Sequence, residues 1–205
     1  MPSNPDIREE RSAQILEAAR EVFARKGFYK ARMDDIAARA NLSKGTLYLY
    51  FKNKDALITA LLDRLFQSEF RDLRAIQKED APATERLRRF LDKLTADVQN
   101  NWLGMLPVVY EFLALIFRNR LVQKAFRQYL REYLSLTVPI IEDGIARGEF
   151  RPVDPRDTAL ALGALFEGTL LLWVYDPETV DVERNIRRGF DLILEGLLTG
   201  KEKTP

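Results

Sequence analysis

Apolar residues recur every three or four positions along nearly the whole chain, and almost no segment shows the alternation of a strand. This spacing is typical of amphipathic helices, whose apolar stripe faces a core. It predicts helices over residues 5–26, 33–40, 44–50, 54–78, 84–100, 104–118, 121–147, 154–175 and 181–198. We therefore predict an all-α fold of about nine helices, with three short N-terminal ones followed by a larger helical bundle.

The residues between these stripes are those that start and stop helices. Gly27 follows the first stripe, and Asn41 tolerates the left-handed conformation that a tight turn needs. Ser43 is a good N-cap for the third helix, and Asp154 with Pro155 starts the eighth as N-cap and first residue. Pro139 should kink the long seventh helix.

The segment from Leu42 to Lys54, "LSKGTLYLYFKNK", carries three lysines and no acid, and aromatic residues stand among them. A charge run is usually a solvated face, and aromatic residues at helical spacing are usually core. The alternative is a surface that binds an anion. Leu47 and Phe51 are expected to be packing residues, and Leu49 partly so.

The second and third predicted helices, joined by a three-residue turn, have the proportions of a helix-turn-helix. The second helix of that motif enters the DNA major groove with its N-terminal residues facing the bases. Lysine, hydroxyl groups and an unobstructed glycine backbone suit phosphate and base contacts there. The candidate DNA contacts are Lys44, Gly45, Thr46, Tyr48, Tyr50 and Lys54.

The chain has 205 residues, 46% hydrophobic and 31% charged, which is typical of a globular protein. It lacks both cysteine and histidine, so thiol chemistry, most zinc sites and the usual general base at neutral pH are improbable. We expect no metal, no cofactor and no enzymatic activity. No signal peptide is visible, and the longest apolar run is short for a membrane span and contains Glu167, so we expect a cytoplasmic protein without membrane contact.

Two segments, "ILEAAREVFARKGF" (15–28) and "MDDIAARANLSKGTLYLYFKNKDAL" (33–57), resemble the signature of the TetR/AcrR family of bacterial one-component transcriptional regulators. The resemblance implies a helix-turn-helix DNA-binding domain over residues 1–54 and an effector-binding and dimerisation domain over 55–205. It places the candidates above at DNA-contacting positions, mostly to phosphate. Arg32 departs from the Ser or Thr that commonly caps the second helix, and as an arginine there it is a further candidate DNA contact. Asn41 stands where the family often has glycine.

The family resemblance also implies a homodimer in which the last two helices pair with those of the partner. The helix over 154–175 is apolar almost all round, which suits such an interface. Glycine inside a helix is costly, and the close approach of a partner helix would explain both glycines in the last one. The expected interface residues are Leu160, Leu171, Gly189, Leu192, Ile193 and Gly196.

Regulators of this kind usually hold an effector within the C-terminal bundle. The aromatic-rich set of candidate lining residues predicts a largely apolar or aromatic effector; it comprises Phe66, Phe70, Trp102, Met105, Tyr110, Phe112, Phe126, Tyr129, Tyr133, Phe166 and Trp173. Glu111 and Glu167 lie in apolar helices, where either could meet a cationic ligand, pair with an arginine or face water. The rival effector is a fatty acyl thioester, for which basic residues are available at Arg118, Arg120, Arg127 and Arg131.

These features predict a repressor that binds double-stranded DNA at a near-palindromic operator and is released from it by a small-molecule effector. Two rivals are a helical scaffold that does not touch DNA and an enzyme. The acid-free, lysine-bearing segment speaks against the scaffold, and the missing histidine and cysteine speak against the enzyme.

Overall fold

The computed structural model describes residues 5–99, 103–117 and 119–199, and within these ranges the regular elements are helices. The helices form two compact units, one made of Met1–Phe66 with Gly104–Phe126 and the other of Gln67–Leu103 with Arg127–Pro205. The predicted all-α fold is confirmed. The predicted domain boundary at residue 54 stays a prediction, although the helix that follows it contributes to both units.

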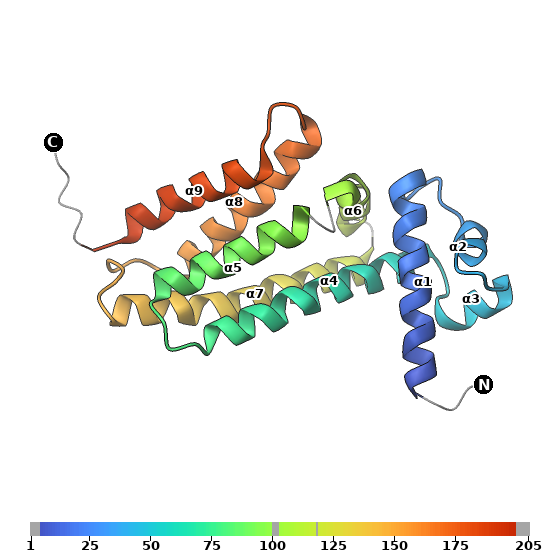
Figure 1. Ribbon diagram of the computed structural model, residues 1–205, viewed down its shortest axis with the longest axis horizontal. Coiled ribbons are helices and arrows are strands. Elements are labelled where there is room, and N and C mark those ends of the chain that lie inside the picture. Colours follow the sequence, from blue (N-terminus) through green and yellow to red (C-terminus); the bar gives the residue numbers. More distant parts are fainter. Residues whose placement is uncertain (1–4, 100–102, 118, 200–205) are drawn as a thin grey trace. The chain divides into compact units, whose positions relative to one another are not determined.

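The first unit is built around α1 (Pro5–Lys26), α2 (Met33–Arg39) and α3 (Lys44–Tyr50), which Figure 1 shows in blue. The apolar stripe of α1 packs against α2, and α2 packs against α3. The fully buried side chains at the centre of this unit are Ile15, Val22, Phe23, Ile36 and Leu47. Their spacing in the sequence is the helical periodicity from which the three helices were predicted.

The breaks between these helices have the predicted conformations. Gly27 has a φ of +74° and Asn41 a φ of +54°, so both occupy the left-handed region. Ser43 caps α3 by accepting a hydrogen bond from the Thr46 backbone N–H at 3.1 Å. The turn therefore holds α2 and α3 in a fixed relation through short local bonds.

The first unit also includes the start of α4 (Lys54–Gln77), α6 (Leu106–Leu113) and the start of α7 (Arg120–Ala146). One helix was predicted over residues 104–118, but the structure has α6 between two 3₁₀ segments, Leu103–Met105 and Ala114–Phe117. Short 3₁₀ turns are common at helix ends.

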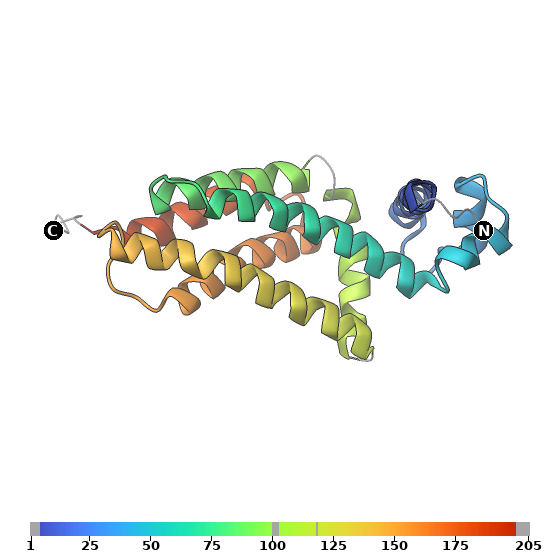
Figure 2. The ribbon, with the colours of Figure 1, turned by 90° about the horizontal axis from the view of Figure 1, so that it is seen from below.

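The second unit is a bundle of α5 (Ala83–Asp97), α8 (Pro155–Tyr175) and α9 (Val182–Leu197) with the later turns of α4 and α7. Figures 1 and 2 show these helices lengthwise beside one another. α8 packs against α9, and α9 packs against α5. The helix α7 continues through Pro139 without ending there, and the kink expected at this residue stays a prediction.

Polar contacts tie α5 into the bundle at its N-terminus. The Glu149 carboxylate accepts hydrogen bonds from the backbone N–H groups of Ala83 (3.0 Å) and Thr84 (3.2 Å), which α5 itself leaves unpaired. The buried Arg86 guanidinium forms an ion pair with Asp143 of α7. These contacts fix the register of α5 on α7.

Among the helices of the described ranges, α8 is long and apolar enough to cross a membrane, judged by length and composition alone. A core helix of a soluble protein meets the same criterion, and α8 buries one face, which includes Ala159, Leu162 and Leu170, against its own chain. The length and composition of α8 are therefore only weak support for a membrane segment. The face of α8 that is not buried against its own chain is also apolar, and this second apolar face needs another explanation.

Candidate DNA-binding surface and effector pocket

The helix α3 divides its side chains between the core and the outside, as the sequence predicted. Leu47 is completely buried, whereas the Tyr48 side chain is 43% exposed. Lys44 and Gly45 are exposed at the N-terminus of the helix, where free backbone N–H groups favour an anion. The arrangement turns hydroxyl, ammonium and backbone N–H groups outward on a short helix of the size that the major groove admits.

Leu49 is 68% exposed, so the expectation that it is partly a packing residue is wrong. Leu49 lies on α3 between Tyr48 and Tyr50. In the structure Leu47 occupies the core, and Leu49, two residues further along the helix, therefore points outward. An exposed leucine here offers an apolar contact of the kind that suits a thymine methyl group. Sequence periodicity over a seven-residue helix is too short to have revealed it.

Two of the candidate DNA contacts bond to acids of α2, Lys44 through its side chain and Arg32 through its backbone. The Lys44 ammonium lies 2.8 Å from Asp34, which raises the pKa of the lysine, and both side chains are well exposed. Arg32 is the N-cap residue of α2, and its backbone N–H donates to Asp35 at 3.0 Å. This bond supplies one half of a capping box, which compensates for the missing Ser or Thr. The Arg32 side chain remains exposed and stays a predicted DNA contact.

Lys54 is turned inward, which differs from the phosphate contact expected from the sequence. Its ammonium donates to the backbone carbonyls of Phe28 (2.7 Å) and Tyr29 (3.0 Å) and lies 4.8 Å from the centre of the Phe28 ring. Burial lowers the pKa of Lys54. The side chain therefore positions the loop between α1 and α2.

The same loop is held from its other side by α6. The Glu111 carboxylate accepts a hydrogen bond from the Phe28 backbone N–H at 2.9 Å and lies against Gly27. We refer to Lys54 and Glu111, which hold the carbonyl and the N–H of Phe28, as the Phe28 clamp. Opposite charges from α4 and α6 thus fix the end of α1 within one compact unit.

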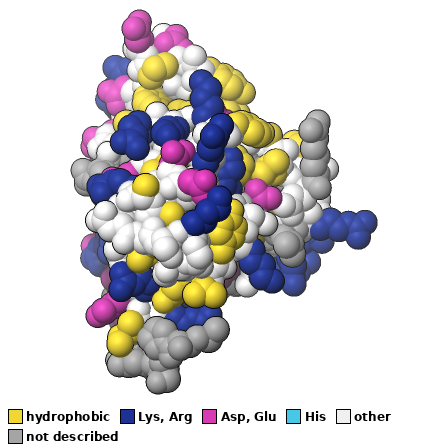
Figure 3. Space-filling model, turned by 90° about the vertical axis from the view of Figure 1, so that its right-hand side faces the viewer, with side chains coloured by type: hydrophobic (Ala, Val, Ile, Leu, Met, Phe, Trp, Pro, Cys, Tyr) yellow, Lys and Arg dark blue, Asp and Glu magenta, His cyan; other side chains and the backbone are white. Residues whose placement is uncertain are grey.

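Figure 3 views the protein from the side on which α2 and α3 appear in Figure 1. Lys and Arg side chains are prominent on this face, and hydrophobic side chains and some Asp and Glu are interspersed among them. A surface of this kind can approach phosphate by charge and bases by apolar contact. The net charge of +1 for the whole chain did not reveal it.

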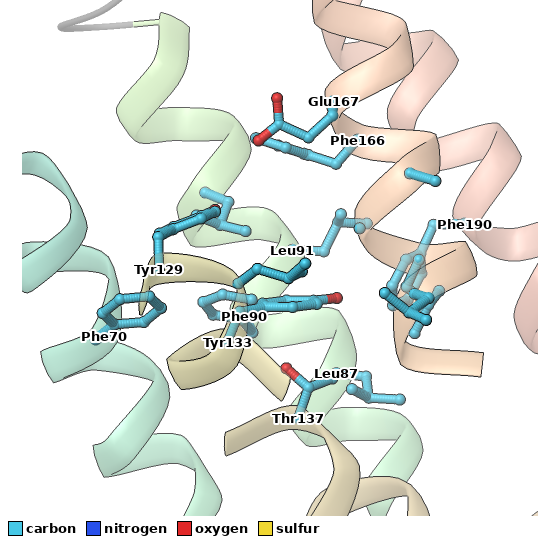
Figure 4. A pocket seen from close by; sticks show the side chains of 16 residues that line it. Phe70, Leu87, Phe90, Leu91, Tyr129, Tyr133, Thr137, Phe166, Glu167 and Phe190 are labelled. Carbon is cyan, nitrogen blue, oxygen red and sulfur yellow. The ribbon is translucent and has the colours of Figure 1, made fainter. Parts of the chain in front are cut away.

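The second unit encloses an elongated cavity of about 270 Å³ between α4, α5, α7, α8 and α9. Figure 4 shows its walls, which are mainly aromatic and aliphatic. Of the predicted lining residues, four do line it, namely Phe70, Tyr129, Tyr133 and Phe166. The sequence analysis missed Leu87, Phe90, Leu91, Leu94, Leu130, Thr137, Leu162, Gly163, Ala164 and Phe190, which also line it.

The other predicted lining residues fall into two groups. Tyr110 and Phe126 belong to the first unit and Trp173 to α8, and none is among the described lining residues. Trp102 lies outside the described residues, as do the side chains of Phe66, Met105 and Phe112. Phe90 and Phe190 were missed because they sit in amphipathic stripes, where a cavity-facing residue and a core residue have the same spacing.

Four side chains with polar groups line the cavity, namely Tyr129, Tyr133, Thr137 and Glu167. The Tyr133 hydroxyl donates to the Ala159 carbonyl at 3.0 Å, and burial raises the pKa of Tyr133 to about 12. Thr137 is 1% exposed; its hydroxyl is close to Tyr133 but has no hydrogen-bond partner of acceptable geometry. Glu167 of α8 lines the cavity and is exposed, yet the protein atoms packed around its carboxyl group raise its pKa by desolvation.

The predicted interface residues lie on α8 and α9. Leu192 is 73% exposed and Leu160 is 38% exposed, although Leu160 also lines the cavity. Leu171 and Ile193 are half-buried. Leu172 (54% exposed) and Tyr175 (70% exposed) extend the apolar surface of α8 and were missed by the sequence analysis.

The two glycines of α9 have different environments. A Cβ atom on Gly189 would lie 2.6 Å from a methyl carbon of Leu165, so this glycine admits α8 of the same chain. Leu165 of the same chain thus accounts for this glycine without a partner helix, and the place of Gly189 in an interface stays a prediction. A Cβ atom on Gly196 would meet nothing within 4 Å, so this position remains open to a partner.

No group of three or more acidic side chains placed to hold a metal ion occurs in the described part of the chain. The polar side chains of the cavity are one carboxylate and hydroxyl groups, and the arrangement lacks a nucleophile paired with a base. What this cavity can offer a molecule is shape, ring faces and one acidic group.

Comparison with known proteins agrees with both units. Residues 15–61 match the family model "Bacterial regulatory proteins, tetR family", and residues 83–197 match "BetI-type transcriptional repressor, C-terminal". The Bacillus subtilis protein described as an uncharacterized HTH-type transcriptional regulator, YfiR, is 30% identical over 202 residues, covering 96% of each chain.

Two solved structures are similar over nearly the whole chain. A putative transcriptional regulator from Saccharomonospora viridis in complex with choline has a TM-score of 0.81 at 23% identity, covering 94% of this chain and 100% of that one. The regulator FadR from Bacillus subtilis in complex with stearoyl-CoA has a TM-score of 0.72 at 25% identity, covering 90% and 98%. The chain thus belongs to the tetR family of bacterial regulatory proteins, which are ligand-responsive, DNA-binding transcriptional regulators.

Proposed function

We propose that this regulator is a repressor that binds a near-palindromic operator through α3 and leaves it when a largely apolar or aromatic molecule fills the cavity of the second unit. The observation that carries the proposal is the combination of an outward-facing α3 and a separate, aromatic-lined cavity in one chain. The DNA contacts we propose are Arg32, Lys44, Gly45, Thr46, Tyr48 and Tyr50, with Leu49 added.

We propose a homodimer for two reasons. Large apolar side chains are exposed on both helices of the isolated chain, Leu172 and Tyr175 on α8 and Leu192 on α9, as expected of helices that pair with their copies. A dimer also accounts for a near-palindrome, because each protomer supplies one recognition helix.

The effector acts, in this proposal, through a change in the spacing of the two recognition helices. A dimer binds both half-sites only when these helices lie about 34–36 Å apart, one turn of DNA, or a multiple of that. A ligand that prefers another spacing lowers operator affinity by its differential affinity for the two conformations. α4 and α7 contribute residues to both units, and α6 is bonded to the end of α1 through Glu111, so these helices are the proposed path.

The test is fluorescence anisotropy of the protein with the DNA upstream of its own gene across a series of salt concentrations. We expect tight binding that falls steeply with salt, because each neutralised phosphate releases counterions. A Lys44→Ala, Tyr48→Ala double variant with unchanged circular dichroism should lose this binding. Salt-insensitive binding, or equal binding by the variant, would refute the assignment of α3 as the reading helix.

Binding to DNA also implies that the protein acts in the cytoplasm.

A second effector class, the fatty acyl thioester, has support from two relatives. The B. subtilis "Fatty acid metabolism regulator protein" is 28% identical, covering 90% of this chain, and the FadR structure contains stearoyl-CoA. Against it, Arg120, Arg127 and Arg131 are not among the described lining residues, and Arg118 lies outside the described residues. The apolar or aromatic effector is therefore the first choice.

A further inference from the structure

The charge balance of the cavity says more about the effector than its apolar walls do. Among the 16 lining residues shown in Figure 4, Glu167 carries the only formal charge, and no lysine or arginine occurs among them. Aromatic rings are the other recurring feature, and they come from Phe70, Phe90, Tyr129, Tyr133, Phe166 and Phe190. A carboxylate surrounded by ring faces attracts a cation in two ways, by charge and by the ring quadrupoles.

The polar groups are distributed along the cavity rather than gathered at one point. Figure 4 shows Glu167 and Phe166 together at one end, where both project from α8. Thr137 of α7 lies at the opposite end, and the Tyr133 phenol lies between the two ends. The space between them is bordered by apolar side chains, including Leu91.

Each end has a physical property that a ligand would satisfy. Desolvation raises the pKa of Glu167, which means that the protein around it disfavours the ionised carboxylate. A bound cation would offset that cost, whereas an anionic head group would increase it. At the other end, the Thr137 hydroxyl is buried without a hydrogen-bond partner of acceptable geometry, and such groups are rare in folded proteins.

We propose that the effector is an organic cation, with an ammonium-type head group against Glu167 and Phe166 and an apolar body directed along the cavity toward Thr137. This assignment deepens the proposed function and rests on it, because it names the ligand class of the same cavity. An effector with a polar atom at the end of its apolar body also gains a hydrogen bond to Thr137.

The lining of the cavity favours a cation over the acyl thioester on chemical grounds. The phosphate groups of such a ligand need basic partners, and the described lining has none. A free fatty acid would bring its carboxylate into a cavity that already holds one, and like charges at short range disfavour each other.

The test uses two ligands of the same shape that differ in charge. Benzyltrimethylammonium carries a quaternary nitrogen where neopentylbenzene has a carbon atom, so the pair isolates the effect of charge. Binding is measured by titration calorimetry or by protein fluorescence, without DNA. We expect the wild-type protein to bind the cation about tenfold or more tightly than the neutral isostere.

Three variants assign the preference to named side chains. Glu167→Gln keeps the size and polarity of the side chain and should weaken cation binding by about tenfold while changing isostere binding less than about twofold. Phe166→Leu should also weaken the cation more than the isostere, since it removes a ring face but keeps an apolar side chain. The matched control is Glu142→Gln, an exposed acid of α7 outside the cavity, which should bind both ligands as the wild type does.

The outcomes separate this inference from the proposed function. Loss of the charge preference in Glu167→Gln, with Glu142→Gln unchanged, supports the cation site. Equal binding of both ligands by the wild type, or binding of neither, overturns it. Operator binding measured on the same protein preparations decides the regulatory function independently, because that assay contains no ligand.

Discussion

Replacing Lys54 by methionine separates a positioning role from a DNA contact. The variant keeps the apolar stem against the Phe28 ring but removes the ammonium that donates to Phe28 at 2.7 Å and Tyr29 at 3.0 Å. Hydrogen bonds to charged groups contribute about 1.5–3 kcal/mol each. The Tyr29 carbonyl is exposed and can accept a hydrogen bond from water instead. The variant also no longer pays the free-energy cost of burying the ammonium, which offsets part of the loss of the Phe28 hydrogen bond.

The net loss is therefore about 1.5–2 kcal/mol of unfolding free energy. For a chain of this length each kcal/mol corresponds to roughly 2–4 °C, so the melting temperature should fall by about 3–8 °C. Lys52→Met is the matched control, since it removes the same charge from an exposed neighbour. Its melting temperature should stay within about 1 °C of the wild type, because surface substitutions usually have small effects.

DNA binding then decides between the two roles. Each lysine–phosphate contact contributes about 0.9 to the slope of log affinity against log salt. Lys44→Met should reduce that slope by about this amount, whereas Lys54→Met should leave it unchanged below its melting transition. A Lys54→Met protein with wild-type melting temperature and a slope reduced by about one would refute the positioning role and restore the phosphate contact.

Three further predictions concern the second unit. The pKa of Tyr133 is raised to about 12, so the folded state keeps the phenolic proton at pH values where the unfolded chain has lost it. The free energy of unfolding should therefore fall by roughly 2–3 kcal/mol between about pH 10 and pH 12 in denaturant titrations. Tyr133→Phe should remove this part of the decline, and an unchanged decline would contradict the assignment. Gly189→Ala should destabilise the protein by up to about 2 kcal/mol, because displacing Leu165 costs about 1–3 kcal/mol whereas alanine gains about 1 kcal/mol over glycine in a helix. Gly196→Ala meets no neighbour, so it should melt at or slightly above the wild-type temperature, and any effect on the dimer is measured by sedimentation; equal melting temperatures of the two variants would contradict the packing argument. Thr137→Val should raise stability by about 1 kcal/mol in chemical denaturation, since it replaces a buried hydroxyl without a partner by a methyl group of similar size; a loss of stability would mean that the hydroxyl is satisfied.

Local patterns predicted the helices because their causes are local. The stripe of α1, the left-handed Asn41 and the Ser43 cap all depend on residues within a few positions of one another. The same reasoning separated Leu47 from Tyr48 on α3, and it identified aromatic residues of α4, α7 and α8 that line the cavity.

Contacts between distant segments could not be predicted in this way. Glu111 reaches Phe28 across 83 positions of the chain, and no spacing rule relates them. Lys54 was predicted to face DNA because lysine at a helix start suits phosphate, but a nearby pair of carbonyls satisfies the ammonium instead. Gly189 is compensated by Leu165 of the same chain, a neighbour that becomes visible only when α8 and α9 are packed.

The most direct test of the account measures the coupling between the cavity and the operator. Operator affinity is determined by fluorescence anisotropy with and without saturating benzyltrimethylammonium, and affinity for the cation is determined with and without operator. The account predicts that each ligand weakens the other by the same factor, as linkage requires, and that Glu167→Gln loses the effect at the same cation concentration. Unchanged operator affinity while the cation occupies the cavity would contradict it.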